Sequence, residues 1–133
     1  MQNHLASDEI ITSIEVSAKQ ANQGMAYAKF SHPASRYAVV GAAASVTVEG
    51  GTVTAASVAV GGVEAAPTMG SSVAACLVGK EPTDAALDEA AAAICSDIGD
   101  DVLSDIFASE DYRKAMAVVY TRRALGCAVE CAG

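Results

Sequence analysis

The stretch "YAVVGAAASVTVEGGTVTAASVAV", residues 37–60, decides the fold of this chain. Valines alternate with small or polar residues on both sides of the pair Gly50-Gly51. A period of two indicates strands with one buried face, and the glycines supply the positive φ angles that a tight hairpin turn requires. The stretch therefore predicts two antiparallel strands, residues 37–48 and 52–60.

Two earlier segments also have strand character. In "EIITSIEV", residues 9–16, β-branched residues dominate, and Ile10, Ile14 and Val16 share one parity. In "MAYAKF", residues 25–30, the pattern predicts a short strand that ends before Pro33, because proline interrupts a ladder. These segments extend the expected sheet to three or four strands.

Beyond Pro67 the periodicity becomes helical. "TMGSSVAACLVG" carries one apolar stripe and stops at Gly79. A second helix is expected from an N-cap at Thr83 through Ile98, and a third begins at Ser109 with two acidic residues in its first turn. Strands followed by helices predict an α+β fold, in which a three- to four-stranded antiparallel sheet packs against a layer of three helices.

The length of 133 residues suits one domain. We expect a tail or linker over residues 1–8, a single α+β domain over residues 9–126 and a C-terminal tail over residues 127–133. Hydrophobic residues make up 52%, but many are alanine and aromatic residues are only 5%. Because alanine buries little area, the elements must approach one another closely.

The charge pattern excludes two classes of partner. The formal net charge is −8, from 16 acidic and 8 basic residues. Nucleic acids and anionic membranes both require clustered cations, so neither is expected. No apolar run reaches about 18 residues, which argues against a transmembrane helix. The start "MQNHLASDEI" lacks the basic and apolar regions of a secretory signal, so we expect a cytoplasmic protein.

No residue cluster has the spacing of a metal site. The four cysteines are not spaced as metal-binding pairs, and neither histidine is near a cysteine in sequence, so we expect reduced thiols. Four aspartates in residues 97–105 allow a divalent metal site or a solvated connection. They lack the ligand alternation and central glycine of a calcium loop, which favours the connection.

The pair Gly61-Gly62 raises the question of a phosphate cradle. The pair follows a strand and precedes a helix, as in nucleotide-binding loops, but no Lys-Ser/Thr pair or three-glycine fingerprint accompanies it. Glu64 would also repel a phosphate. We interpret the glycines as a sharp exit from the sheet, with Pro67 helping to start the helix.

Polar residues in two places allow functional and structural interpretations. His32 lies in "KFSHPASR" with Lys29 and Arg36 nearby, and is either an exposed loop residue or part of a polar cluster that faces a ligand. The arginines of the last helix either pair with acidic residues or contribute to a subunit contact; they are Arg113, Arg122 and Arg123.

Four stretches in order resemble a known family. They are "LASDEIITSIEV", "YAKFSHPASRYAVVGAAASVTVEGGTVTAASVAVGGVEAAP", "LVGKEPTDAAL" and "SDIFASEDYRKAMAVVYTRRAL". Together they resemble the C-terminal domain of the flavoprotein (medium) subunit of molybdenum hydroxylases, the carbon monoxide dehydrogenase and xanthine dehydrogenase family. The resemblance implies an oxidoreductase domain that helps shape a flavin site, docks partner subunits and is not catalytic alone.

The resemblance also implies cofactors and partners. The complete subunit would hold FAD in a preceding FAD-binding domain, which we do not find before Met1, so we expect no cofactor in the isolated chain. The partners would be that domain, an iron–sulfur subunit and a molybdopterin subunit. The resemblance places Lys29 and His32 near the flavin. The start at Met1 leaves open a fragment of a longer subunit or a free-standing, non-catalytic module that binds another protein or itself as a homo-oligomer.

Overall fold

A four-stranded antiparallel sheet covered on one face by helices forms the fold. The computed structural model describes residues 5–133. In chain order the elements are β1 (Gln23–Ser31), β2 (Ala38–Glu49), β3 (Thr52–Gly61), β4 (Thr68–Met69), α1 (Ser71–Leu77), α2 (Asp84–Ala92), the 3₁₀ helix η1 (Ala93–Ser96) and α3 (Glu110–Ala132). The strands lie in the order β1-β2-β3-β4, and all neighbouring pairs are antiparallel. The predicted α+β fold is confirmed.

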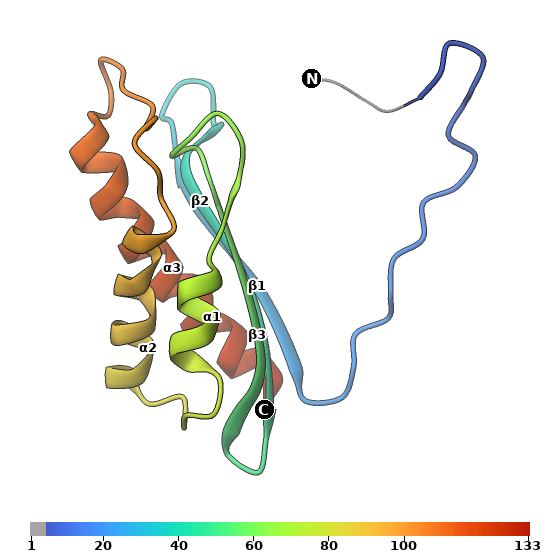
Figure 1. Cartoon of the computed structure of the whole chain (residues 1–133), viewed down its shortest axis with the longest axis vertical. Coiled ribbons are helices and arrows are strands. Elements are labelled where there is room, and N and C mark those ends of the chain that lie inside the picture. Colours follow the sequence, from blue (N-terminus) through green and yellow to red (C-terminus); the bar gives the residue numbers. More distant parts are fainter. Residues whose placement is uncertain (1–4) are drawn as a thin grey trace.

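The helices lie on one side of the sheet and leave the other side open (Figure 1). The central β2–β3 hairpin has the predicted turn, with φ of +57° at Gly50 and +81° at Gly51. Inward valines of these strands pack with α1, α2 and α3 into one core, and Val46 and Val58 are almost completely buried. The period of two in the sequence therefore separates the helix-covered face from the open face.

The alanine-rich composition has the expected consequence where α3 crosses β1. A Cβ built on Gly24 would lie 1.7 Å from the carbonyl oxygen of Ala128. Only a residue without a side chain allows the helix backbone to approach the strand this closely. The helix layer thus packs on the sheet partly through close backbone contact and not through large side chains alone.

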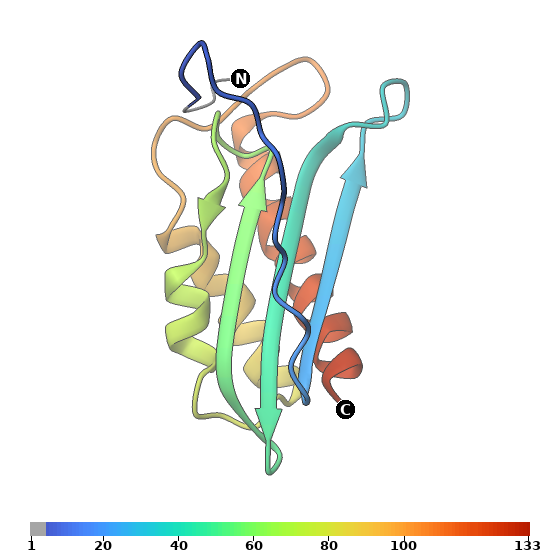
Figure 2. The ribbon, with the colours of Figure 1, turned by 90° about the vertical axis from the view of Figure 1, so that its right-hand side faces the viewer.

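The segment at residues 9–16 differs from the sequence-based expectation. It is extended but belongs to no strand of the sheet. Ile10, Ile14 and Val16 are 81%, 83% and 87% exposed. Figure 2 shows the segment passing in front of the open sheet face, and Figure 1 shows that it stands away from it. The pattern was strand-like, but no sheet edge in residues 5–133 pairs with it.

The helix boundaries differ in detail. The residues before α1 form β4, and the second predicted helix divides into α2 and η1 at Ala93. The third helix begins at Glu110, one residue after the predicted start at Ser109, which is its N-cap, and extends to Ala132. The division of the chain at residues 8 and 126 remains a prediction.

Candidate functional site

The β1–β2 connection, residues 32–37, is a tightly bonded loop that contains His32, one of the two residues predicted to lie near a flavin. The amides of Ala34 and Ser35 each donate to Nδ1 of His32 at 3.2 Å. The backbone of His32 also donates to the carbonyl of Tyr37 at 2.8 Å. Because Nδ1 accepts two hydrogen bonds, the neutral ring carries its proton on Nε2. The His32 side chain therefore organises the loop and keeps one N–H donor.

Lys29 reaches the same loop from β1. Its exposed ammonium donates to the carbonyl oxygen of Arg36 at 3.2 Å. Arg36 has a φ of +61°, a left-handed conformation that is uncommon for a residue with a side chain. The structure thus brings Lys29, His32 and Arg36 together around one short loop, and adds local strain at its tip.

A second loop, residues 97–109, meets the first at the same end of the molecule (Figure 1). The ring of His32 lies edge-on to Phe107, with 4.2 Å between ring centroids. Phe107 is 60% exposed, Ile106 is 92% exposed and Tyr37 is 80% exposed. We call His32, Tyr37, Ile106 and Phe107 together the loop end. Large apolar side chains exposed together are typical of a contact surface.

Arg113 of α3 holds the loop end in place. Its side chain is buried, and one guanidinium nitrogen donates to the carbonyl oxygens of Val39 and Gly62 at 2.7 Å each. The other terminal nitrogen donates to Asp105 at 2.5 Å. Amides of Phe107 and Ala108 also donate to the Asp105 carboxylate. These two amides, and then Arg113, lower the pKa of Asp105 below its ordinary value.

The contacts of the Gly61-Gly62 loop favour the structural interpretation. Gly62 has a φ of +81°, and a Cβ there would lie 2.5 Å from the carbonyl oxygen of Val39. Glu64 accepts hydrogen bonds from the hydroxyl of Thr68 and from the amide of Gly99. The carboxylate of Glu64 is therefore held close to the loop in sequence by contacts with Thr68 and Gly99.

The start of α1 is likewise occupied by a carboxylate of the chain itself. Asp97 accepts from the amide of Ser72 at 2.9 Å and from its hydroxyl at 3.0 Å. A free amide at this position would be needed to bind a phosphate. The Ser72 amide is already engaged by Asp97 and is not such a group.

Two of the four aspartates in the 97–109 loop have separate structural roles. Asp97 binds the start of α1 and Asp105 binds Arg113. Across residues 5–133, no group of three or more His, Cys, Asp or Glu side chains is arranged to hold a metal. All four cysteines are free thiols. Within the same residues, no helix is long and apolar enough to cross a membrane.

The other arginines of α3 also bind within the fold. Arg122 donates to Asp84 and Asp88 of α2 at 2.6 Å each, and these partners, Asp88 first, raise the pKa of Arg122. The guanidinium of Arg123 lies 4.8 Å from the ring centroid of Tyr120. Arg113 and Arg122 thus pair with acidic residues, in agreement with the first interpretation, whereas Arg123 contacts an aromatic ring.

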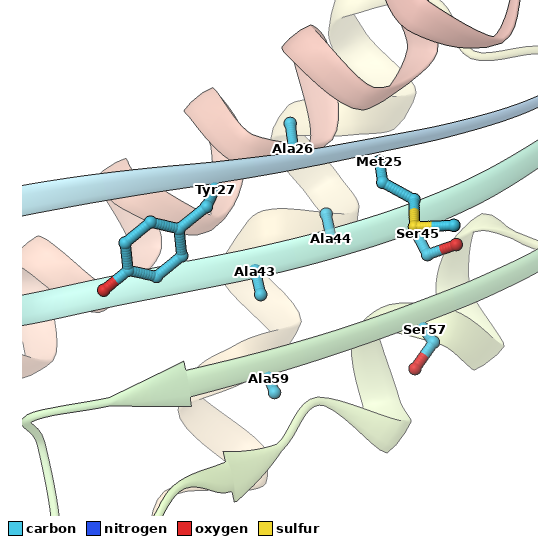
Figure 3. A pocket seen from close by; sticks show the side chains of 8 residues that line it. All are labelled: Met25, Ala26, Tyr27, Ala43, Ala44, Ser45, Ser57 and Ala59. Carbon is cyan, nitrogen blue, oxygen red and sulfur yellow. The ribbon is translucent and has the colours of Figure 1, made fainter. Parts of the chain in front are cut away.

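A shallow hollow on the open sheet face was not anticipated from the sequence. Its volume is about 450 Å³. Figure 3 shows the strands that form it, with Met25 and Tyr27 on β1 beside small side chains of β2 and β3. A Cβ on Gly41 would lie 2.3 Å from the Tyr27 hydroxyl, so the tyrosine lies over this glycine. The sequence feature that could have indicated this hollow is the small residue at every second position of β2 and β3.

Comparison with known proteins places this fold in a family. The model of the CO dehydrogenase flavoprotein C-terminal domain matches residues 25–128. No curated protein sequence matches the chain. Among solved structures, a chain of carbon monoxide dehydrogenase from Hydrogenophaga pseudoflava, in a form lacking the Mo-pyranopterin moiety of the molybdenum cofactor, is 31% identical with a TM-score of 0.77. The alignment covers 85% of this chain and 39% of that chain.

Two further solved structures agree. Reconstituted CO dehydrogenase from Oligotropha carboxidovorans is 31% identical with a TM-score of 0.75, and quinoline 2-oxidoreductase from Pseudomonas putida 86 is 28% identical with a TM-score of 0.76. Each alignment covers 83% of this chain and 38% of the other, so the chain spans well under half the length of these neighbours. With the fold and the family match in agreement, the chain belongs to the CO dehydrogenase flavoprotein C-terminal domain family.

Proposed function

We propose that the chain serves as the C-terminal domain of a molybdenum-hydroxylase flavoprotein subunit, where its loop end covers one side of the FAD site. The observation that carries this proposal is the convergence of Lys29 and His32 on the 32–37 loop, together with the exposed aromatic residues beside it. The domain supplies positioning and is not catalytic alone. The four free thiols support the cytoplasmic location expected from the sequence.

The residues present fit a flavin chemically. The flavin ring offers carbonyl oxygens and ring nitrogens as acceptors, and becomes more negative on reduction. The exposed ammonium of Lys29 and the Nε2–H of His32 are donors, and Phe107 and Tyr37 offer aromatic surfaces. When bound, FAD supplies the electron-transfer chemistry. In this proposal the chain's own side chains orient the ring and exclude water from it.

The proposed partners are the FAD-binding domain, the iron–sulfur subunit and the molybdopterin subunit of the same enzyme. The exposed side chains of the loop end provide apolar contact area for the first of these. Since solved neighbours are much longer than this chain, the domain is suited to act within a larger assembly.

The test uses the assembled flavoprotein carrying this chain. Lys29→Met removes a cation beside the flavin, so the reduced anionic form loses stabilisation. We expect the flavin midpoint potential to fall by about 20–30 mV, which corresponds to ~1 kcal/mol for a two-electron couple. Lys80→Met, which removes the Glu89 partner at another site, is the control and is expected to leave the potential unchanged. Unchanged potential and FAD content in both Lys29→Met and His32→Gln would reject the flavin-facing role.

A free-standing interaction module is the second candidate function. The exposed apolar residues of the 9–16 segment and the loop end favour it, because such surfaces promote association. Sedimentation of the isolated chain over a range of concentrations separates the two functions. A stable homo-oligomer that Ile106→Asp dissociates would support the module, whereas a monomer would leave the flavoprotein role as the better account.

A further inference from the structure

The segment of residues 9–16 has the chemistry of a β-strand without a sheet. Five of its residues are β-branched, and Ile10, Thr12, Ile14 and Val16 share one face when the backbone is extended. The backbone is extended, yet these isoleucines and the valine are more than 80% exposed. By contrast, the valines at 46, 53 and 60 are fully buried. An alternating apolar segment of this kind is unstable as an isolated strand in water.

The domain's own sheet does not supply the missing partner. The ladder pairs in residues 5–133 begin at Gln23, and β1 forms one edge of the sheet. A turn between Gln20 and Gln23 precedes β1, and Lys19 donates to the carbonyl oxygen of Cys131 at 3.1 Å. These contacts fix the base of the segment at the end of α3, and from there the chain stands clear of the sheet (Figure 1).

The open sheet face is a poor alternative partner. Figure 2 shows the segment running in front of this face. However, a sheet face presents only side chains, so it cannot pair the amides and carbonyls of an extended segment. The hollow there is also lined partly by the hydroxyls of Ser45 and Ser57. Residues 9–16 need a sheet edge with an apolar layer beneath it.

We propose that residues 9–16 form a strand that adds to the edge of a sheet in the flavin-binding portion of the same flavoprotein subunit. This inference rests on the proposed function. The family match begins only at residue 25, after the segment, and the chain covers 38–39% of the solved neighbours. The neighbours therefore contain a large region with no counterpart in this chain, which is the source of the partner sheet. Main-chain hydrogen bonds would hold the strand at the sheet edge. Its side chains Ile10, Ile14 and Val16 would pack on the apolar layer that lies beneath that sheet.

This strand would tether the two portions of the subunit. Only six residues, 17–22, separate it from β1. With the strand fixed in one portion and β1 in the other, the loop end is confined to a limited range of positions relative to the flavin-binding portion. Strand addition thus raises the effective concentration of this domain beside the flavin-binding portion without requiring a large interface between them.

The first experiment uses the isolated full chain. Ile14→Asp places a charge on the apolar face of the segment. If the segment packs on nothing within this chain, the Tm stays within about 1 °C of the parent value. A fall of several degrees would show that the segment packs on its own domain, and a parent dimer dissociated by Ile14→Asp would show pairing between copies. Either result would overturn the inference.

The second experiment replaces the matched region of the Hydrogenophaga pseudoflava chain, and the segment before it, with residues 9–133 of this chain. Hydrogen exchange is then followed in the assembled subunit. An edge strand pairs every second amide with its neighbour, so we expect alternate amides of residues 10–16 to exchange at least about 100-fold more slowly than in the isolated chain. Thr12→Pro should abolish this protection because proline cannot donate to a ladder. Equal exchange rates in the two samples would refute strand addition.

A matched control and a separate readout complete the design. The control is Ser7→Pro, tested in a version that begins at residue 5. Ser7 lies outside the strand, in a turn in which the amide of Glu9 donates to the carbonyl of Ala6. This variant should preserve the protection of residues 10–16. Flavin content is measured on the same samples. Flavin bound with residues 10–16 unprotected contradicts the strand but retains the proposed function. Protection of residues 10–16 in a sample without bound flavin would support the strand and contradict the proposed function.

Discussion

Arg113 on α3 and Asp105 in the preceding loop form a 2.5 Å ion pair in which the arginine is buried and the aspartate is half exposed. The pair connects the helix layer to the segment that carries Phe107, which in turn contacts His32. Arg113 also bonds two carbonyls at the ends of β2 and β3. The position of the loop end therefore depends on a side chain of the last helix.

Replacement of Arg113 by Met should destabilise the domain. It leaves the buried carbonyl of Val39 and the partly buried carbonyl of Gly62 without their donor, and we expect a loss of about 2–4 kcal/mol in the free energy of unfolding. The half-exposed ion pair contributes little to this figure. Urea unfolding measures the loss, and Arg123→Met, at an exposed position of the same helix, should have a much smaller effect. Equal midpoints for Arg113→Met and the parent would contradict this role.

Asp105 should make the domain sensitive to acid. Its folded pKa is lowered from 3.8 by the amides of Phe107 and Ala108 and by Arg113. As the pH falls past 3.8, the unfolded chain takes up the proton first, so the stabilisation present at higher pH is lost as the pH falls further through the folded pKa. The Asp105→Asn variant has no carboxyl group at this position, so its stability lacks this pH dependence. The Tm difference between parent and variant should narrow between pH 6 and pH 3, and a constant difference would argue against the assignment.

Gly24→Ala should disturb the packing of α3 on β1. The added Cβ would overlap the backbone carbonyl of Ala128, which has no side-chain freedom with which to move away. We expect a cost of about 3 kcal/mol in the free energy of unfolding, at the upper end of overpacking effects. Gly61→Ala is the matched control, because a Cβ there meets no atom within 4 Å. Similar stability for the two variants would show that α3 can shift freely.

Asp97→Ala should weaken the start of α1. The substitution removes the acceptor of the Ser72 amide and hydroxyl, and we expect it to lower the free energy of unfolding by about 1–2 kcal/mol. Asp100→Ala, at an exposed position in the same loop, provides the comparison. Thermal unfolding of both variants measures the difference. A loss no greater than that of Asp100→Ala would leave the capping role unsupported.

Local sequence patterns predicted much of the fold. The β2–β3 hairpin follows from alternating valines and Gly50-Gly51, and the predicted N-cap Thr83 accepts the expected amide hydrogen bond. The pattern of residues 9–16 was equally strand-like, yet a strand also requires a neighbour. Local periodicity expresses a preference for extended backbone, whereas pairing depends on an edge supplied from elsewhere.

The candidate site was predictable only in part. The sequence placed Lys29 and His32 close together, but the contact of His32 with Phe107 spans 75 residues. The hydrogen bond of Arg113 to Val39 spans 74 residues, and that of Asp97 to Ser72 spans 25. By itself the sequence determined the three long strands of the sheet and the positions of the helices, because those preferences arise from neighbouring residues and their periodicity. Only the tertiary structure decided which charged side chains became buried anchors and which small residues allow close approach, because burial and partnership are set by packing between distant segments.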